Sequence, residues 1–145
     1  MIVLELDGEP RGKGRPRSRV AWTKDYKPFV AVYTDVETRA YEDALAWAAK
    51  AAYRGKPLSG ALCIAVTAFM GVPKSWSAKK RDAALVGAIR PVGTPDFDNI
   101  SKVIDALHGI IFENDSQIVD ARVIKLYDER PRLRIEVSPL DPLTG

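Results

Sequence analysis

The chain has 145 residues, of which 46% are hydrophobic and 28% charged, an ordinary globular composition that predicts one domain spanning residues 1–145. No apolar run approaches the ~18 residues of a membrane-spanning helix, and Met1–Glu5 lacks a basic signal-peptide start, which excludes a helical membrane protein and predicts a cytoplasmic one without a membrane partner. The net charge is +3. Cys63 is the single cysteine, so no intramolecular disulfide can form, and it is predicted to be a small core residue.

The first part of the chain is predicted to hold two strands and one long helix. Alternating apolar residues predict a strand over residues 2–6. The stretch 8–19 is predicted to be an exposed basic loop, because its glycines and prolines break regular structure and its cations are too crowded to be buried. A strand at 29–33 is followed by Thr34–Glu37, which has the form of a capping box and opens an Ala-rich helix ending near Tyr53.

The second part of the chain is predicted to be built around one apolar strand. Ala61–Met70 is β-rich and almost uncharged, as expected for a central strand covered on both faces. Beyond it we expect, in chain order, a short basic helix capped by Ser75 or Ser77, a loop at 87–95, strands at 118–126 and 133–137, and a loose tail at 139–145.

The most informative segment lies between that loop and the next strand. If a helix begins at Asp98 and extends to about Leu107, its apolar residues share one side, while Asp98 and Lys102 lie on the other. Asp96 points to the same place when the chain before the helix is extended. The apolar stripe consists of Ile100, Val103, Ile104 and Leu107.

Carboxylates in this arrangement are suited to Mg²⁺ or Mn²⁺, which prefer oxygen ligands and fill their remaining positions with water and phosphate. Asp115 is the candidate third acid, because it precedes a predicted strand able to lie beside the helix. The residues leave an alternative open, in which Asp98 is an N-cap paired with Lys102 and Asp115 closes an Asx turn.

Charges of opposite sign are separated along the chain, with cations in residues 11–27 and acids in residues 96–129. A basic surface beside an acidic focus suits an enzyme that acts on a polyanion, because cations bind phosphates and acids bind a metal. Solvated charge on an ordinary soluble protein is the alternative. The cations predicted to contact DNA are Arg11, Lys13, Arg15, Arg17 and Arg19, joined by Lys79, Lys80 and Arg81.

The pattern Asp96-x-Asp98-Asn99-x-x-Lys102, with Asp115 before Gln117–Val119, resembles the signature of the RusA family of Holliday junction resolvases. The continuation Asp120–Lys125 is similar as well, and the basic opening from residue 8 to 17 is similar to that of phage-type relatives. Asn114 departs from the pattern, where relatives have another acid.

The resemblance implies that Asp96, Asp98 and Asp115 bind Mg²⁺ or Mn²⁺ and that Lys102 supports catalysis. It implies an α/β (α+β) fold, a compact single domain with a mixed β-sheet packed with helices. It further implies a homodimer that cuts four-way DNA junctions by paired symmetric nicks in recombination and repair. Two alternatives remain: a metal-dependent phosphohydrolase or nuclease acting on other DNA structures, and a non-catalytic basic DNA-binding accessory protein.

Overall fold

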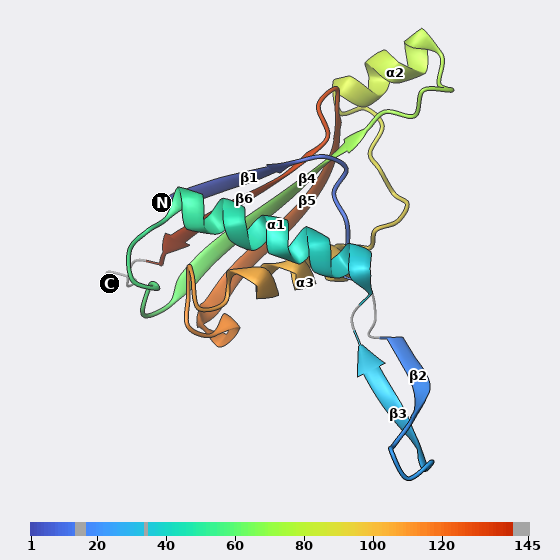
Figure 1. Ribbon diagram of the computed structural model, residues 1–145. Coiled ribbons are helices and arrows are strands. Elements are labelled where there is room, and N and C mark those ends of the chain that lie inside the picture. Colours follow the sequence, from blue (N-terminus) through green and yellow to red (C-terminus); the bar gives the residue numbers. More distant parts are fainter. Residues whose placement is uncertain (14–16, 34, 141–145) are drawn as a thin grey trace.

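The computed structural model describes residues 1–13, 17–33 and 35–140. Arg15, Thr34 and the predicted tail beyond Leu140 lie outside the described residues. The described elements are β1 (Ile2–Asp7), β2 (Arg17–Trp22), β3 (Pro28–Tyr33), α1 (Val36–Ala52), β4 (Leu62–Gly71), α2 (Ala78–Leu85), α3 (Phe97–Lys102), the 3₁₀ turns η1 (Val103–Leu107) and η2 (Asp115–Gln117), β5 (Ile118–Asp128) and β6 (Arg132–Pro139). They form the α+β fold that the sequence predicted (Figure 1).

The main sheet has four strands in the order β1-β6-β4-β5. β4 lies in its interior, antiparallel to β6 and parallel to β5, so the predicted mixed sheet is confirmed. The parallel pair requires a long crossover, and the chain from α2 through α3 and η2 provides it. No helix in the described part of the chain is long and apolar enough to cross a membrane.

The core lies between this sheet and the helices α1 and α3 with η1, which pack on one face of the sheet (Figure 1). Alternate residues of β4 are buried there, and the apolar stripe after Asp98 faces them. That stripe is confirmed, because Ile100, Val103 and Leu107 are at most 1% exposed. The predicted single helix is instead α-helical only to Lys102 and continues as a 3₁₀ turn.

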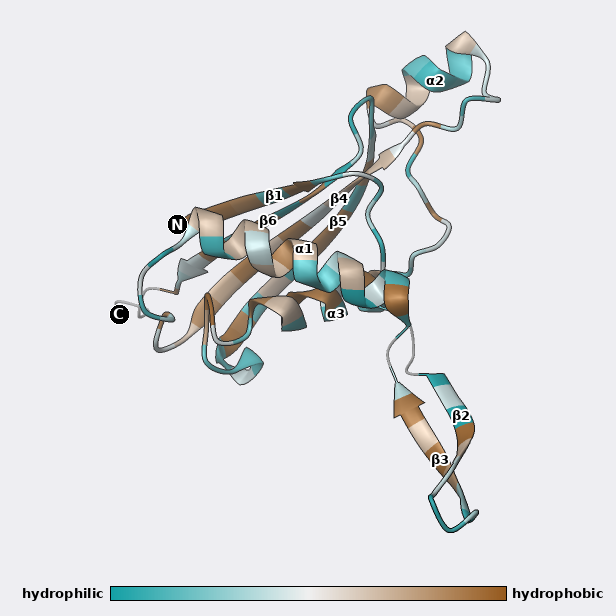
Figure 2. Cartoon of the chain, in the orientation of Figure 1, coloured by the Kyte–Doolittle hydropathy of each residue, from teal (hydrophilic) through white to brown (hydrophobic). Residues whose placement is uncertain are grey.

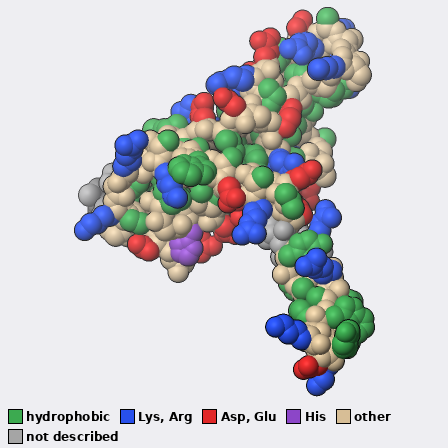
Figure 3. Space-filling view, in the orientation of Figure 1, with side chains coloured by type: hydrophobic (Ala, Val, Ile, Leu, Met, Phe, Trp, Pro, Cys, Tyr) green, Lys and Arg blue, Asp and Glu red, His purple; other side chains and the backbone are tan. Residues whose placement is uncertain are grey.

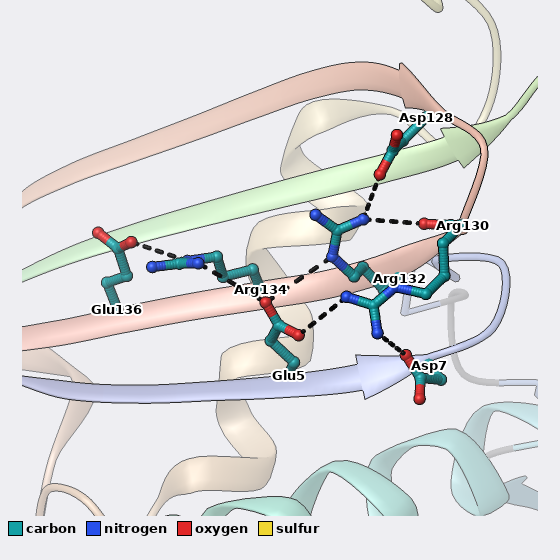
Figure 4. Close-up of polar contacts among 7 residues, drawn as sticks. All are labelled: Glu5, Asp7, Asp128, Arg130, Arg132, Arg134 and Glu136. Carbon is teal, nitrogen blue, oxygen red and sulfur yellow. Dashed lines mark hydrogen bonds and ion pairs between the residues drawn. The ribbon is translucent and has the colours of Figure 1, made fainter. Parts of the chain in front are cut away.

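The opposite face of the sheet is polar at β1 and β6 (Figure 4). Glu5 lies 3.5–3.7 Å from the guanidinium groups of three arginines, namely Arg130, Arg132 and Arg134. Arg132 also bonds Asp128, and this bond lowers the pKa of the Asp128 carboxyl. The residues of β4 on this face are only partly buried, so the prediction that β4 is covered on both faces is wrong. Cys63 points to this face and is partly buried, so the prediction that it is a core residue is wrong as well.

β2 and β3 form an antiparallel hairpin that projects from the body (Figure 1). The predicted loop at 8–19 is wrong over residues 17–19, which pair with Ala31–Tyr33. The breakers Gly12, Gly14 and Pro16 all precede residue 17, so nothing prevents the chain from pairing after them.

Helix caps follow local side-chain chemistry. The N-cap of α1 is Asp35, whose carboxylate accepts hydrogen bonds from the backbone N–H of Thr38 at 2.7 Å and from its hydroxyl at 3.0 Å. The backbone hydrogen bond, followed by the hydroxyl, lowers the pKa of Asp35. The predicted capping box is thus one residue out of register. Ser77 caps α2, as predicted.

Candidate active site

Asp96 occupies the N-cap position of α3, and Asp98 lies in the first turn. The backbone of Asp96 is extended, with φ −69° and ψ 157°, while its carbonyl accepts the first helical bond from Ile100 at 3.0 Å. Within the described residues the Asp96 side chain makes no capping hydrogen bond. The Asp96 carboxylate therefore does not close the helix. The alternative in which Asp98 is the N-cap is wrong, because the cap lies two residues earlier and Asp98 is in the first turn.

Both acids line one surface pocket of about 440 Å³. Asp96 and Asp98 line it from the start of α3, and Lys125 lines it from β5. The remaining lining residues come from the segment before the helix and from the helix itself: Pro91, Val92, Gly93 and Phe97. The extended backbone of Asp96 allows residues two apart to share this pocket.

Lys125 is a pocket residue that the sequence reasoning did not single out. Its ammonium donates a hydrogen bond to the carbonyl oxygen of Gly93 at 2.5 Å, which ties β5 to the segment leading into α3. A signal was present, because Val123, Lys125 and Tyr127 share one face of the strand, and the helix-facing side of the sheet is otherwise apolar. A lone cation on such a face indicates a polar site beneath the covering helices.

Lys102 lies one turn after Asp98, with 3.8 Å between its Nζ and Asp98 Oδ2. Both side chains are more than half exposed, at 53% and 55%. Exposed i,i+4 pairs of this kind stabilise a helix by only ~0.3–0.5 kcal/mol. The ammonium of Lys102 is thus held weakly enough to exchange Asp98 for a phosphate.

Asp115 begins η2 and is exposed. The turn is closed by Asn114, whose side chain accepts from Ser116 N at 2.9 Å, and by Gln117, which accepts from the backbone of residues 113 and 114. The Asx turn therefore belongs to Asn114. Asp115 is not among the residues lining the pocket, and across the described parts of the chain no three Asp, Glu, His or Cys side chains gather as a metal cage.

The structure thus brings Asp96 and Asp98 together and leaves Asp115 outside their pocket. The pair alone fits a magnesium-type ion, since Mg²⁺ is commonly held by one or two carboxylates, with water and substrate phosphate completing its shell. Lys102, one turn after Asp98, and Lys125, in the pocket, place positive charge near the two acids, which suits binding of a substrate phosphate. The donor set is all oxygen, as Mg²⁺ and Mn²⁺ require.

The start of the basic loop is fastened to the helix that carries the acids. Lys13 N donates to the carbonyl oxygen of Asn99 at 2.8 Å, and Lys13 Nζ lies 3.2 Å from both Glu42 and Asp105. Partial burial on its own would lower the pKa of Lys13, but the hydrogen bonds with Glu42 and Asp105 outweigh it and raise the pKa. Lys13 was predicted to contact DNA, whereas its ammonium here joins the loop to α1 and η1.

Gly12 is required by this close approach. A Cβ at residue 12 would lie 2.7 Å from Asn99 Cβ and 3.0 Å from Pro95 Cβ, which is closer than carbon atoms pack. Since Asn99 directly follows Asp98, the loop supports the backbone of the acidic helix.

The other predicted DNA contacts lie mostly on two projections, the hairpin and α2 (Figure 3). Some have acidic partners: Arg11 with Glu37 at 2.6 Å, Arg17 with Asp35 at 3.9 Å and Arg81 with Glu129 at 3.9 Å. Others lie over aromatic rings: Arg19 over Tyr33 at 5.6 Å and Lys80 over Trp76 at 4.0 Å. Lys79 is exposed on α2. The segment joining α2 to α3, which lines the pocket, runs between the two projections (Figure 1).

Paired carboxylates that share a pocket with Lys125, with Lys102 one helical turn away and basic projections on either side, are an arrangement that suits a metal-dependent nuclease. The family profile of endodeoxyribonuclease RusA matches residues 7–138, and the chain therefore belongs to the RusA endodeoxyribonuclease family. It is also 33% identical over 139 residues to "Uncharacterized protein YqaN" of Bacillus subtilis (strain 168), an alignment that covers 94% of each chain. The resemblance seen in the acidic motif is thereby confirmed.

Proposed function

We propose that this protein is a metal-dependent, structure-selective endodeoxyribonuclease that resolves Holliday junctions by paired symmetric nicks in DNA recombination and repair. The observation that carries the proposal is the shared pocket of Asp96, Asp98 and Lys125 in a chain of the RusA family. Family membership supports DNA as the substrate, and the pocket supplies oxygen ligands and positive charge side by side.

In this proposal Asp96 and Asp98 hold Mg²⁺ or Mn²⁺. The family motif implies Asp115 as a third carboxylate; it does not line their pocket, and its part in nicking is what the Asp115→Asn variant tests. The bound metal would supply a nucleophilic water at neutral pH and neutralise charge on the phosphate. Lys102 stabilises the negative charge that develops on the scissile phosphate. Lys125 orients the rim of the pocket through its bond to Gly93.

A homodimer suits the substrate. A four-way junction has approximate twofold symmetry, so two copies related by a twofold axis present identical sites to opposing strands. The cations of the two projections would then bind phosphates, and recognition would depend on junction shape.

The test is cleavage of a synthetic four-way junction with Mg²⁺ by the unmodified protein and by Asp96→Asn, Asp98→Asn, Asp115→Asn and Lys102→Ala. The variants Asp96→Asn, Asp98→Asn and Asp115→Asn are expected to keep junction binding and lose nicking.

Asp120→Asn is the matched control, which is expected to nick normally, because Asp120 is exposed on β5 and does not line the pocket. Cleavage by the four site variants at the rate of the unmodified protein would refute the proposal. Faster cleavage of flaps or plain duplex would favour another nuclease activity, and binding without any cleavage would favour an accessory protein.

A further inference from the structure

The β2–β3 hairpin has two chemically different faces. Residues directly opposite each other in an antiparallel pair share a face. One face, here called the apolar face, carries Ser18 with Val32, Val20 with Val30, and Trp22 with Pro28. The other, here called the cationic face, carries Arg17 with Tyr33, Arg19 with Ala31, and Ala21 with Phe29.

The side chains of the apolar face are exposed in a single copy of the chain. Figure 2 shows hydrophobic residues in both strands of the hairpin, and Figure 3 shows hydrophobic side chains on its surface. The exposed fractions are 64% for Val20, 64% for Trp22, 68% for Val30 and 70% for Val32. In the described part of the chain, each hairpin strand packs chiefly against the other. An isolated two-stranded hairpin is marginally stable in water, so a surface that covers this face would stabilise it.

The chemistry of the two faces indicates what covers each. The apolar face holds aliphatic side chains, one indole and no charged residue, so it offers nothing to a phosphate. The cationic face combines arginines with aromatic rings, including Arg19 over Tyr33, which suits nucleic acid. The separation leaves the apolar face for a protein partner.

We propose that the apolar face of the hairpin docks on a second copy of this chain, in a reciprocal exchange in which each hairpin lies on the body of the other copy. The inference deepens the proposed function, because paired nicks require two active sites in one assembly. Contact through the uncharged face also avoids bringing the arginines of two copies together.

The available area favours reciprocal exchange over two stacked hairpins. Four apolar side chains offering on the order of 100 Å² each give roughly 400 Å² per hairpin. Two hairpins stacked face to face would bury about 800 Å² in total, below the ~1,200–2,000 Å² of a stable specific interface. Two hairpins that each cover a patch of the partner's body would bury about 1,600 Å², which lies within that range.

The test compares Val30→Lys with Val86→Lys by sedimentation velocity across a range of protein concentrations. Val30 lies in the middle of the apolar face, whereas Val86 is an equally simple exposed site, 81% accessible, at the end of α2. The unmodified chain and Val86→Lys are expected to dimerise alike. Val30→Lys is expected to dimerise at least about a hundredfold more weakly, because it puts a charge into an apolar contact. A dimer of unchanged strength in Val30→Lys, or a monomeric unmodified chain, would overturn the inference.

A second measurement does not depend on how well Val30→Lys folds. The variant Trp47→Phe/Trp76→Phe leaves Trp22 as the single tryptophan. Its emission is expected to move to shorter wavelengths as protein concentration rises through the dimerisation range. A shift that appears only on adding junction DNA would assign the apolar face to DNA and overturn the inference.

The outcomes separate this inference from the proposed function. Loss of the dimer in Val30→Lys, with no junction cleavage by the unmodified protein, would support the docking surface and refute the resolvase. Junction cleavage by the unmodified protein, together with an equally strong dimer in Val30→Lys, would support the resolvase and refute the docking surface.

Discussion

Replacing Gly12 by alanine tests whether the basic loop must lie directly on the acidic helix. The added Cβ would lie 2.7 Å from Asn99 Cβ, 3.0 Å from Pro95 Cβ and 3.3 Å from the carbonyl carbon of Asn99. Gly12 does not have a left-handed backbone, so alanine is compatible with its conformation, and the contact alone causes the strain. Either the loop or α3 must move.

The expected cost follows from three terms. An extra methyl group in a tight contact costs ~1–3 kcal/mol. Loosening the 2.8 Å bond from Lys13 N to the Asn99 carbonyl costs about 1 kcal/mol more. Alanine also restricts the unfolded chain, which offsets about 0.4–1 kcal/mol. The net loss of ~1–3.5 kcal/mol lowers the melting temperature by roughly 3–12 °C in a domain of this size.

The functional effect follows from the position of Asn99 beside Asp98. A shift of the helix start moves a carboxylate of the pocket, so nicking is expected to fall at least about tenfold, while junction binding stays within about twofold. Thermal unfolding by circular dichroism and junction nicking are the two assays. Gly93→Ala is the control for stability, because its Cβ would meet nothing within 4 Å. A melting temperature for Gly12→Ala within about 1 °C of that of Gly93→Ala would refute the reasoning.

Three further predictions concern other parts of the molecule. Lys125→Met removes the bond that holds the pocket rim and is expected to lower nicking with junction binding retained; full nicking would contradict its role. Asp128→Asn removes a carboxyl whose pKa is lowered from 3.8 by its hydrogen bond with Arg132. The stabilisation from this pair is therefore fully present above pH 3.8 and is lost as the pH falls through the pKa of Asp128 in the folded protein. The unfolding free energies of this variant and of the unmodified chain should therefore differ at neutral pH and converge as the pH falls below the folded pKa of Asp128; a difference that does not change with pH would contradict this reasoning. Arg17→Ala/Arg19→Ala should reduce the slope of log K for junction binding against log salt concentration by about 1.8, if each arginine neutralises one phosphate. An unchanged slope would show that the DNA does not contact these two arginines.

Features set by local periodicity could be predicted from the sequence. The apolar stripe after Asp98 follows from the 3.6-residue repeat, which survives the change to a 3₁₀ turn because Ile100, Val103 and Leu107 still face the sheet. The strand at the N-terminus follows from simple alternation, and Ser77 follows from cap preference.

Features that depend on residues distant in the sequence could not be predicted from the sequence. Residues 17–19 include two arginines and follow a run of glycines and prolines, and they form a strand because apolar β3 pairs with them. Lys125 reaches the pocket because β5 lies parallel to β4 beneath α3, a register that no local pattern contains. The position of Asp115 depends on the turn that Asn114 and Gln117 build, so its sequence motif does not specify its distance from Asp98.

The cations of the N-terminal basic segment and of α2 have different roles in the fold, and not all of them are free to bind DNA. Lys13 is engaged by Glu42 and Asp105, so this cation serves the architecture of the acidic pocket. The cations of the hairpin and α2 project from the body, where pairing with their own chain is weak or absent within the described residues. DNA releases its condensed counterions when cations of a protein bind its phosphates. In the proposed function, the exposed cations of the projections therefore supply most of the affinity for DNA, and the loop held by Lys13 supplies the geometry of cleavage. Variants of the two groups should accordingly separate binding from nicking.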